Sequence, residues 1–379
     1  MQLLGARTVP QFLSRYWQKR PLVVRNAISE VKYLVQATEL FRLASRDDIE
    51  SRVVRHAGQR WSLAHGPFAA SALRRMPANN WTLLVQGLNL HNPQADRLLR
   101  LFNFIPYARL DDVMASYAVS GGGVGPHVDS YDVFLVQGTG RRRWRIGRPG
   151  NAGFIKGAPL RILKHFEPEQ EYLMEAGDLL YLPPGWAHDG IALDACITYS
   201  IGFRAPARSE LMSEFLMRFS ERITEEGRFP GLYRDPDLRV QSRPSSIPPA
   251  MIDKTATMLS QLRFTRRNIV DFLGEYLSEP KPRIVFNRPR GPLSVAQFTT
   301  ALRMHGIKLN SRTLMLHSQG ALFINGERLL SKGALLTRLI HLADRRELPS
   351  GRYSQSLCRL LYDWYVAGWL WVGNRESNA

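Results

Sequence analysis

The chain has 379 residues, of which 44% are hydrophobic and 22% charged, and this ordinary globular composition excludes a disordered chain or a fibre. The length allows two or three domains, at roughly 100–200 residues per domain. The net charge is +18, but the basic residues are scattered from Arg7 to Arg375 and form no tail, so direct nucleic-acid binding is compatible with the composition and not required by it.

The apolar runs near the chain ends and the two cysteines indicate in which cellular compartment the protein is expected. The first ten residues contain no apolar run long enough for a signal peptide, and the most apolar late run, Leu360–Gly373, is interrupted by Asp363. No stretch approaches the ~20 apolar residues that span a bilayer. We therefore expect a soluble, cytoplasmic protein without membrane contact. Cys196 and Cys358 lie far apart without metal-ligand spacing, so they are expected to be buried thiols.

The first hundred residues mix short helical and strand patterns, for example at Val9–Trp17 and Trp81–Leu88. From Asp112 to about Pro206, short apolar runs alternate with Gly, Pro and Asp. Regular short strands separated by turn residues predict a β-barrel or sandwich. The predicted strands are Met114–Val119, Val133–Gln137, Arg143–Ile146, Tyr172–Met174, Leu179–Leu182 and Cys196–Phe203.

A helical pattern begins near Ala207. Apolar residues recur at helical spacing over Leu211–Ile223 and, after the Pro-rich break Arg243–Pro249, over Met258–Leu277. Two amphipathic helical stretches joined by a loop suit an oligomer contact, and they suit packing against the chain's own barrel equally well.

The Pro- and Arg-rich segment Lys281–Pro292 indicates a linker. The turn Ser318-Gln-Gly320 between two alternating runs predicts a hairpin. The elements predicted after this linker are a helix, two strands and two further helices, an order compatible with a small winged-helix-like domain. The predicted elements are a helix at Val295–Met304, strands at Lys308–Leu316 and Ala321–Leu330, and helices at Ala334–Leu342 and Gln355–Ala367.

Three residues in the predicted barrel are candidate metal ligands. His127 and Asp129 follow a glycine-rich run and are two apart, so on a strand their side chains point the same way. A predicted strand then ends in a Pro183-Pro-Gly185 turn that delivers His188. Two histidines and one carboxylate form the facial triad of non-haem Fe(II) oxygenases, which leaves metal positions open for a co-substrate and O2.

A co-substrate that chelates such a metal needs an anchor for its far carboxylate. In the run Arg141–Ile146, alternation places Arg142 on the same face as the apolar Trp144 and Ile146, so Arg142 is predicted to point into the barrel. A guanidinium can hold a carboxylate in a bidentate grip. Ser116 and Thr198, on neighbouring strands, could add hydroxyl hydrogen bonds or could satisfy local backbone groups.

Two motifs carry a family resemblance. The patterns Gly121-(x5)-His127-x-Asp129 and Gly177-(x5)-Pro183-x-Gly185-(x2)-His188 resemble the cupin motifs in the form used by JmjC oxygenases. The run GGGVGPHVDSYDVFLVQGTGRRRWRIG resembles the bacterial ribosomal oxygenases, which hydroxylate an arginine of a large-subunit ribosomal protein, number sixteen of the L series. The resemblance is strong over residues 1–206 and rests mainly on element order over 207–379.

The resemblance implies a mainly β fold with added helices. Residues 1–206 would form a double-stranded β-helix (jelly-roll, cupin/JmjC) catalytic domain, 207–284 a helical dimerisation region and 285–379 a winged-helix domain. It implies Fe(II) on His127, Asp129 and His188, and 2-oxoglutarate on Arg142 with support from Ser116 and Thr198. The family usually has Asn where this chain has Thr198. A ribosomal protein would be the substrate, and the enzyme would be a homodimer.

Two other functions fit the same residues. One is an oxygenase of this fold with another substrate, such as a histidyl hydroxylase or a protein demethylase. The other is a metal-bearing cupin without oxygenase activity that binds RNA or ribosomes through its basic surface. An arginine substrate would suit acidic residues near the barrel mouth, for which the candidates are Asp111, Asp112, Asp132 and Asp189.

Overall fold

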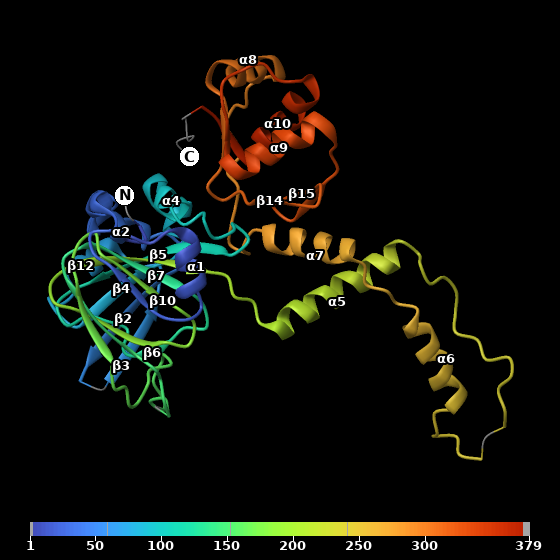
Figure 1. The fold of residues 1–379 in the computed structure, drawn as a ribbon, viewed down its shortest axis with the longest axis horizontal. Helices are drawn as coiled ribbons and strands as arrows, with labels where there is room; N and C mark the ends of the chain where they lie inside the picture. Colours follow the sequence, from blue (N-terminus) through green and yellow to red (C-terminus); the bar gives the residue numbers. More distant parts are fainter. Residues whose placement is uncertain (1–2, 59, 152, 241, 374–379) are drawn as a thin grey trace. The chain divides into compact units, whose positions relative to one another are not determined.

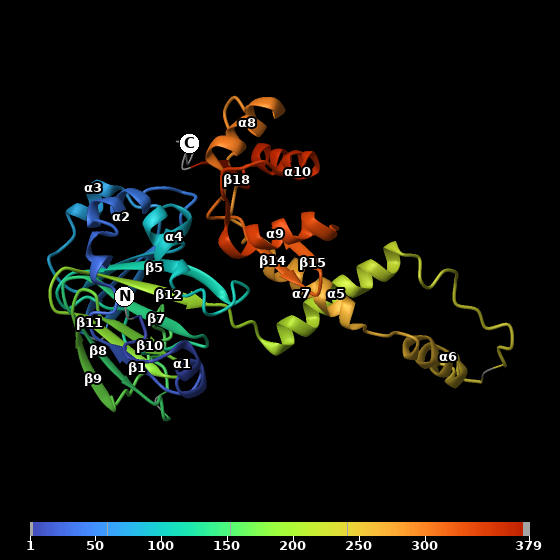
Figure 2. The ribbon, with the colours of Figure 1, turned by 45° about the horizontal axis from the view of Figure 1, so that its top comes forward.

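The chain folds into two units, Met1–Ala205 and Pro206–Ala379, which appear in Figures 1 and 2. The computed structural model describes residues 3–58, 60–151, 153–240 and 242–373. Among these residues, no helix is long and apolar enough to cross a membrane. Cys196 and Cys358 are both buried and unpaired, as predicted.

Two antiparallel sheets form the first unit (Figure 1). The larger has the strand order β1-β10-β7-β12-β5-β4-β2-β3 and the smaller the order β6-β11-β8-β9. Two such facing sheets form the predicted double-stranded β-helix, which is confirmed. The strands are β1 Leu22–Val24, β2 Ser51–Ala57, β3 Arg60–His65, β4 Trp81–Val85, β5 Leu110–Ala118, β6 His127–Val128, β7 Val133–Thr139, β8 Arg142–Gly147, β9 Gln170–Met174, β10 Leu179–Leu182, β11 Ala187–Ala192 and β12 Cys196–Phe203.

Helices pack on the outer face of the larger sheet. Thr8 caps α1 by accepting a hydrogen bond from the Gln11 N–H, and α1 buries Phe12 completely against this face. Burial of such a side chain contributes roughly 1.5–3 kcal/mol. The helices are α1 Val9–Arg15, α2 Ala37–Leu43, α3 Ala70–Arg74 and α4 Pro93–Arg100, with short 3-10 turns at Ser29–Tyr33 and Leu88–Leu90.

Strand alternation divides the side chains of β7 between two cores. Phe134 and Val136 pack into the core under the helices, whereas Val133 and Leu135 point between the sheets toward Trp144 of β8. The apolar cluster between the sheets fills part of that space. The rest remains a cavity, which is lined by His127, Asp129, Arg142 and His188 among others.

The second unit contains helices followed by the predicted winged-helix order of elements (Figure 2). Its separate apolar core includes Phe298, Leu342 and Leu361, all essentially inaccessible to solvent. The elements are α5 Arg208–Glu225, α6 Pro249–Ser260, α7 Arg266–Ser278, α8 Val295–His305, β13 Ile307–Leu309, β14 Met315–Ser318, β15 Ala321–Ile324, β16 Glu327–Leu329, α9 Gly333–Arg345, β17 Glu347–Leu348, α10 Gln355–Val366 and β18 Leu370–Val372.

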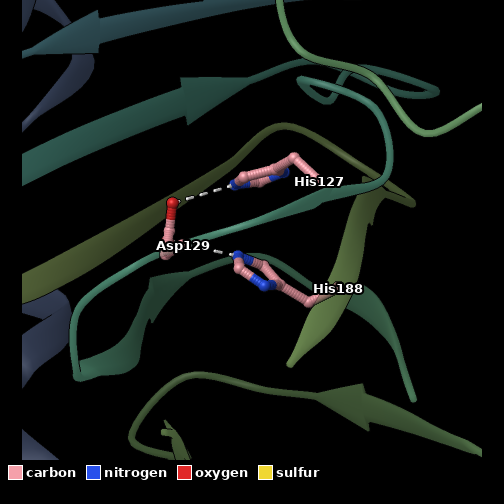
Figure 3. A group of neighbouring side chains, drawn as sticks. All are labelled: His127, Asp129 and His188. Carbon is pink, nitrogen blue, oxygen red and sulfur yellow. Dashed lines mark ion pairs between the residues drawn. The ribbon is translucent and has the colours of Figure 1, made fainter. Parts of the chain in front are cut away.

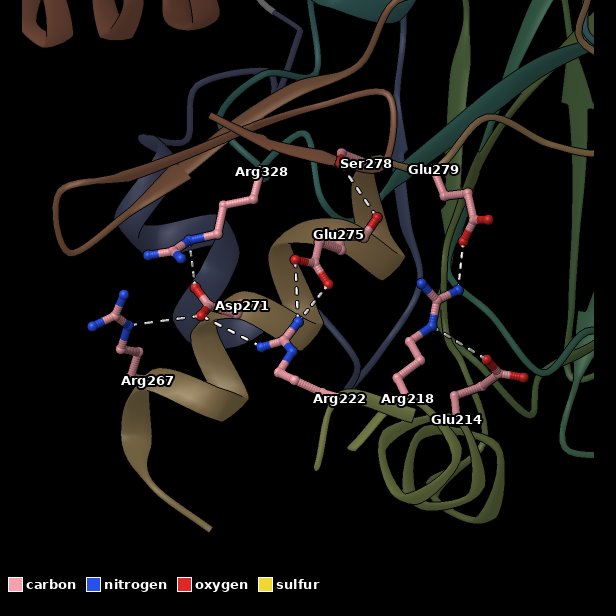
Figure 4. A network of polar contacts seen from close by, with 9 residues as sticks. All are labelled: Glu214, Arg218, Arg222, Arg267, Asp271, Glu275, Ser278, Glu279 and Arg328. Carbon is pink, nitrogen blue, oxygen red and sulfur yellow. Dashed lines mark hydrogen bonds and ion pairs between the residues drawn. The ribbon is translucent and has the colours of Figure 1, made fainter. Parts of the chain in front are cut away.

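A network of ion pairs centred on buried Asp271 connects elements of this unit (Figure 4). Its carboxylate lies 3.5 Å from Arg222 of α5 and 2.9 Å from Arg328 of β16, and 3.9 Å from Arg267 of α7 itself. Arg222 also pairs with Glu275 at 2.9 Å. The network therefore joins α5 and β16 to the intervening helix α7.

Two strand predictions in the winged helix were wrong. The predicted strand Lys308–Leu316 is divided between β13 and β14, which belong to different sheets. Asn310 makes the break, because its side-chain oxygen accepts from the Arg312 N–H at 3.0 Å and its amide donates to the Gly368 carbonyl at 2.9 Å. The predicted strand Ala321–Leu330 is a hairpin that turns at Asn325-Gly326, where both residues have positive φ.

The predicted continuous helical stretch Met258–Leu277 was also wrong, because the chain breaks between α6 and α7. Thr265 starts the new helix by accepting a hydrogen bond from the Asn268 N–H, and the Asn268 side chain accepts from the Thr265 N–H. Such a reciprocal cap satisfies donors that an uninterrupted helix would not expose. The predicted Ser318-Gln-Gly320 turn is confirmed between β14 and β15.

Candidate metal centre and co-substrate cavity

Two short paired strands bring two histidines face to face. In the antiparallel pair of β6 and β11, His127 is directly opposite His188, and their ring centroids are 4.2 Å apart. The strand β6 contains only two residues, so Asp129 lies just beyond it. The sequence prediction had placed His127 and Asp129 on the same strand. The Asp129 carboxylate nevertheless lies 3.9 Å from His127 Nε2 and 3.6 Å from His188 Nε2 (Figure 3).

The turn between β10 and β11 determines where His188 lies. Gly185 has a φ of +80°, a conformation that glycine adopts without steric cost. Its N–H donates to the backbone carbonyl of Asp129 at 2.9 Å. This hydrogen bond attaches the turn to the chain next to the carboxylate. His188 is therefore the second residue of β11 and not a residue of the turn itself.

Hydrogen bonds orient both imidazole rings. His127 Nδ1 donates to the Gly125 carbonyl at 2.9 Å, and His188 Nδ1 donates to the Trp186 carbonyl at 3.1 Å. Because a carbonyl only accepts, each proton is held at Nδ1 and each Nε2 presents a lone pair toward Asp129. Burial and the neighbouring His127 lower the pKa of His188 well below its usual range, which keeps this ring neutral.

The three side chains suit a divalent metal ion. One ligand atom from each residue lies within 4.8 Å of the others. Burial raises the pKa of the Asp129 carboxyl, and the neighbouring His127 acts in the opposite direction. A bound cation would favour the ionised carboxylate. Two imidazole nitrogens and one carboxylate oxygen match the donor set of non-haem Fe(II) oxygenases.

These residues open into a cavity of about 380 Å³ between the two sheets. That volume is in the range of small-molecule sites. Its polar and charged lining is Arg52, Thr82, Gln86, Asp111, Asp112, Ser116, His127, Asp129, Tyr131, Arg142, Arg161, His188 and Ser200. Its apolar lining includes Met114, Val133, Leu135 and Trp144.

Arg142 is buried in this cavity with only 4% of its surface exposed. Its two terminal nitrogens donate to Ser116 Oγ at 3.2 and 3.3 Å, and its Nε has no hydrogen-bond partner. Among the described residues, no carboxylate pairs with it. A buried charge without a counterion is costly, so a ligand carboxylate fits this position. Arg141, by contrast, is exposed and pairs with Asp194.

The two predicted hydroxyl contacts have different environments. Ser116 and Thr198 are paired across β5 and β12, and both are buried. Ser116 lines the cavity and contacts Arg142. Thr198 is not among the lining residues, and its hydroxyl donates to Gln137 Oε1 at 2.9 Å. Its contact with a co-substrate stays a prediction.

Two of the four candidate acidic residues lie at the cavity. Asp111 and Asp112 line it, and Asp112 accepts a hydrogen bond from the Gln86 side chain at 2.7 Å. Asp132 and Asp189 are outside the lining and have other partners. Asp132 accepts from Tyr181 and Gln18, and Asp189 pairs with Arg145.

Comparison with known proteins identifies the family. A JmjC domain model matches residues 97–211, and a ROXA-like winged-helix model matches residues 261–371. The ribosomal protein uL16 3-hydroxylase of Escherichia coli is 35% identical over 325 residues, covering 84% of this chain and 85% of that protein. The chain belongs to the JmjC-type ribosomal oxygenases. A probable ribosomal oxygenase of Haemophilus influenzae is 36% identical to this oxygenase over 60% of its chain and 54% of that protein.

Solved structures agree over almost the whole oxygenase. An X-ray structure of Escherichia coli YcfD matches it with a TM-score of 0.84 at 32% identity. A complex of YcfD with cobalt and 2-oxoglutarate matches with a TM-score of 0.81 at 31% identity. Each comparison covers 97% of this chain and 98% of the other.

Several cavity residues of the oxygenase were missed by the sequence predictions. Met114 shares a face of β5 with Asp112 and Ser116, so strand alternation could have found it. Arg52 of β2 and Leu63 of β3 come from far earlier in the chain. No local pattern connects those two positions to the metal-ligand motif, because only the order of strands in the larger sheet brings them to the cavity.

Proposed function

We propose that this protein is an Fe(II)- and 2-oxoglutarate-dependent oxygenase that hydroxylates an arginine side chain of the large-subunit ribosomal protein uL16. The observation that carries the proposal is one cavity that contains both a two-histidine, one-carboxylate cluster and a buried arginine that pairs with no carboxylate of the described residues. The similar uL16 3-hydroxylase supports the choice of substrate.

In this proposal His127, Asp129 and His188 hold Fe(II). The bound metal, with 2-oxoglutarate and O2, supplies the oxidising chemistry that hydroxylates a carbon–hydrogen bond and releases succinate and CO2. The protein's own contribution is preorganisation. The carbonyls of Gly125 and Trp186 hold the Nδ1 protons, so both Nε2 lone pairs are available without rearrangement.

Arg142 binds the far carboxylate of 2-oxoglutarate in the proposed complex. Its terminal nitrogens already converge on Ser116 Oγ, so the guanidinium is held in place before the co-substrate arrives. Ser116, and to a smaller extent Thr198, would support the same carboxylate. A carboxylate from the co-substrate would supply the counterion that no described residue gives to Arg142.

The acidic residues Asp111 and Asp112 suit a cationic substrate side chain. They line the same cavity as the metal cluster, and a carboxylate is the preferred partner of a guanidinium. We propose that they face the substrate arginine while Val133 and Leu135 exclude water from the reacting end of the cavity. Cytoplasmic action is part of the proposal, because ribosomal proteins are made there.

The test is a mass measurement on uL16 and on a short arginine-containing uL16 peptide, incubated with Fe(II), 2-oxoglutarate and the protein. We expect a mass increase of one oxygen on a single arginine, with equimolar succinate. Chelation of Fe(II) should abolish both, and added Fe(II) should restore them. Hydroxylation of a histidine peptide only, or demethylation of a lysine peptide, would assign a different substrate and refute the arginine proposal.

We also propose that residues 207–284 form a dimerisation region and residues 285–379 a separate winged-helix domain. Large apolar side chains of α5 are exposed, including Met212 at 65% and Leu216 at 51%. In α6, Ile252 is 56% exposed and no residue is buried. A second copy would cover such surfaces. Light scattering should give twice the chain mass, and Leu216→Glu with Ile252→Glu should reduce it to the monomer.

A further inference from the structure

Two hairpins that flank the cavity carry an unusual concentration of positive charge. The first is the β2–β3 hairpin, where residues 51–66 include Arg52, Arg55 and Arg60 and no Asp or Glu. Arg52 and Leu63 of this hairpin line the cavity. The hairpin therefore forms one side of the cavity and extends beyond it.

The second hairpin spans residues 153–164. A bridge between Phe154 and Leu163 closes it, with hydrogen bonds from the Ile155 N–H to the Ile162 carbonyl at 2.9 Å and from the Lys164 N–H to the Gly153 carbonyl at 3.0 Å. It too contains basic residues and no Asp or Glu. Its residues Leu160, Arg161 and Ile162 line the cavity.

The two hairpins approach each other next to the metal-ligand motif. A Cβ atom at Gly125, two residues before His127, would lie 3.1 Å from both Trp61 of β3 and Ile162 of the second hairpin. Both therefore pack against the same point of the chain. Arg55 and Arg60 are in register with Ser62 and Ala57, so they lie on the face of the first hairpin opposite Arg52 and Leu63. Because β3 is an edge strand, this face adjoins the second hairpin at the edge of the larger sheet.

We name the exposed cations of the two hairpins the basic rim: Arg55, Arg60, Lys156, Arg161 and Lys164. In the described part of the chain, none of the five forms an ion pair with a carboxylate. Elsewhere in this unit, exposed Arg42 and Arg141 pair with Glu39 and Asp194, whereas the exposed residues Arg15, Arg74 and Arg97 form no ion pair among the described residues either. Neighbouring cations without counterions repel one another, and a polyanion would relieve that repulsion.

An exposed aromatic ring accompanies these cations. Phe154 is 46% exposed, and the guanidinium carbon of Arg161 lies 4.5 Å from its ring centroid. Proteins that bind single-stranded nucleic acids combine a cationic surface for the phosphates with aromatic and arginine planes on which unpaired bases stack. An acidic protein partner would use the charges but would not need the exposed ring.

We propose that the basic rim binds RNA, with phosphates along the two hairpins and an unpaired base against Phe154 and Arg161. RNA held there would lie beside the cavity mouth. The oxygenase would then recognise its ribosomal-protein substrate together with the RNA that the substrate contacts. This inference concerns recognition and does not depend on which side chain is hydroxylated.

The test uses the full-length protein and a short fluorescein-labelled RNA stem-loop, with anisotropy measured between about 50 and 200 mM KCl. The rim variant R60E/K156E/K164E changes three exposed residues outside the cavity lining. The control variant R15E/R74E/R97E makes the same change in net charge on α1, α3 and α4. We expect the rim variant to lose at least ~10-fold in affinity, with a salt slope shallower by about 2–3, and the control to change by less than about threefold.

Three results would overturn the proposal. One is an equal loss of affinity in both variants, since that would reflect overall charge alone. Another is competition by polyglutamate as strong as by unlabelled RNA of equal charge. The third is a failure of Phe154→Ala to weaken binding to the stem-loop. Hydroxylation of a short peptide should be the same in the rim variant and the wild type, so a failure of the proposed chemistry would be seen separately.

Discussion

Each unit of the protein contains a buried charged side chain, and the two have opposite surroundings. Arg142 in the first unit contacts Ser116 and has no carboxylate partner among the described residues. Asp271 in the second unit lies within ion-pair distance of three arginines. Both are at least 90% buried.

The comparison separates a proposed co-substrate site at Arg142 from a structural contact at Asp271. A buried charge without a counterion costs several kcal/mol, and the fold retains that cost only where a ligand can offset it. Asp271 is already neutralised, and its partners come from separate elements, so its role is to join them. A buried charge is therefore informative about function when its partner is missing from the protein.

The largest expected effect comes from the metal cluster. Asp129→Ala and His188→Ala should each reduce turnover below detection, because each removes one of three proposed ligands. Succinate formation and peptide mass measure the effect. His165→Ala is the matched control, since His165 is exposed and outside the cavity lining. Normal turnover in Asp129→Ala would refute the proposed ligand set.

The next largest effect is expected on 2-oxoglutarate binding when Arg142 is replaced. Arg142→Ala should weaken 2-oxoglutarate binding by about 2–5 kcal/mol, which corresponds to roughly 30-fold to several-thousand-fold in the co-substrate KM. Arg142→Lys should give an intermediate value because the charge remains and the bidentate geometry is lost.

A substitution of Arg142 should also change the stability of the ligand-free protein. Arg142→Met should leave the ligand-free protein as stable as the wild type or more stable, because it removes a buried charge without a counterion. Thermal unfolding measures this. A large loss of stability in Arg142→Met would mean that the arginine is structural and would remove the contrast with Asp271.

A loss of stability is expected when Asp271 is replaced. Asp271→Ala should destabilise the second unit by about 2–4 kcal/mol, less than for a fully buried pair because its arginines are partly exposed. Urea unfolding followed by far-UV circular dichroism measures it. Asp253→Ala in α6 is a control at an exposed carboxylate and should change stability by less than about 0.5 kcal/mol. Peptide hydroxylation should persist in both variants.

The smallest effect is expected at Thr198. Thr198→Val removes its hydrogen bond to Gln137 and should cost about 1 kcal/mol of stability. We expect the 2-oxoglutarate KM to change by less than about threefold, and Ser116→Ala to change it more. A rise in KM for Thr198→Val as large as for Arg142→Ala would make Thr198 a principal co-substrate ligand.

Local patterns predicted much of the first unit. The strands near Val133–Gln137, Leu179–Leu182 and Cys196–Phe203 are confirmed, because turn residues separate short apolar runs there. The second unit was less predictable. Its Asn325-Gly326 hairpin was missed although that dipeptide favours a tight turn, and the break at Asn310 depends on a hydrogen bond to Gly368, far along the chain.

The sequence by itself determined the residue types of the metal cluster, the alternation that turns Arg142 inward and the family. These depend on neighbours within a few positions. Tertiary structure alone decided that His188 pairs with His127, that no carboxylate of the described residues pairs with Arg142 and that Arg52 and Leu63 reach the cavity. Those facts depend on strand order and on what surrounds each side chain, which residues far apart in the chain decide.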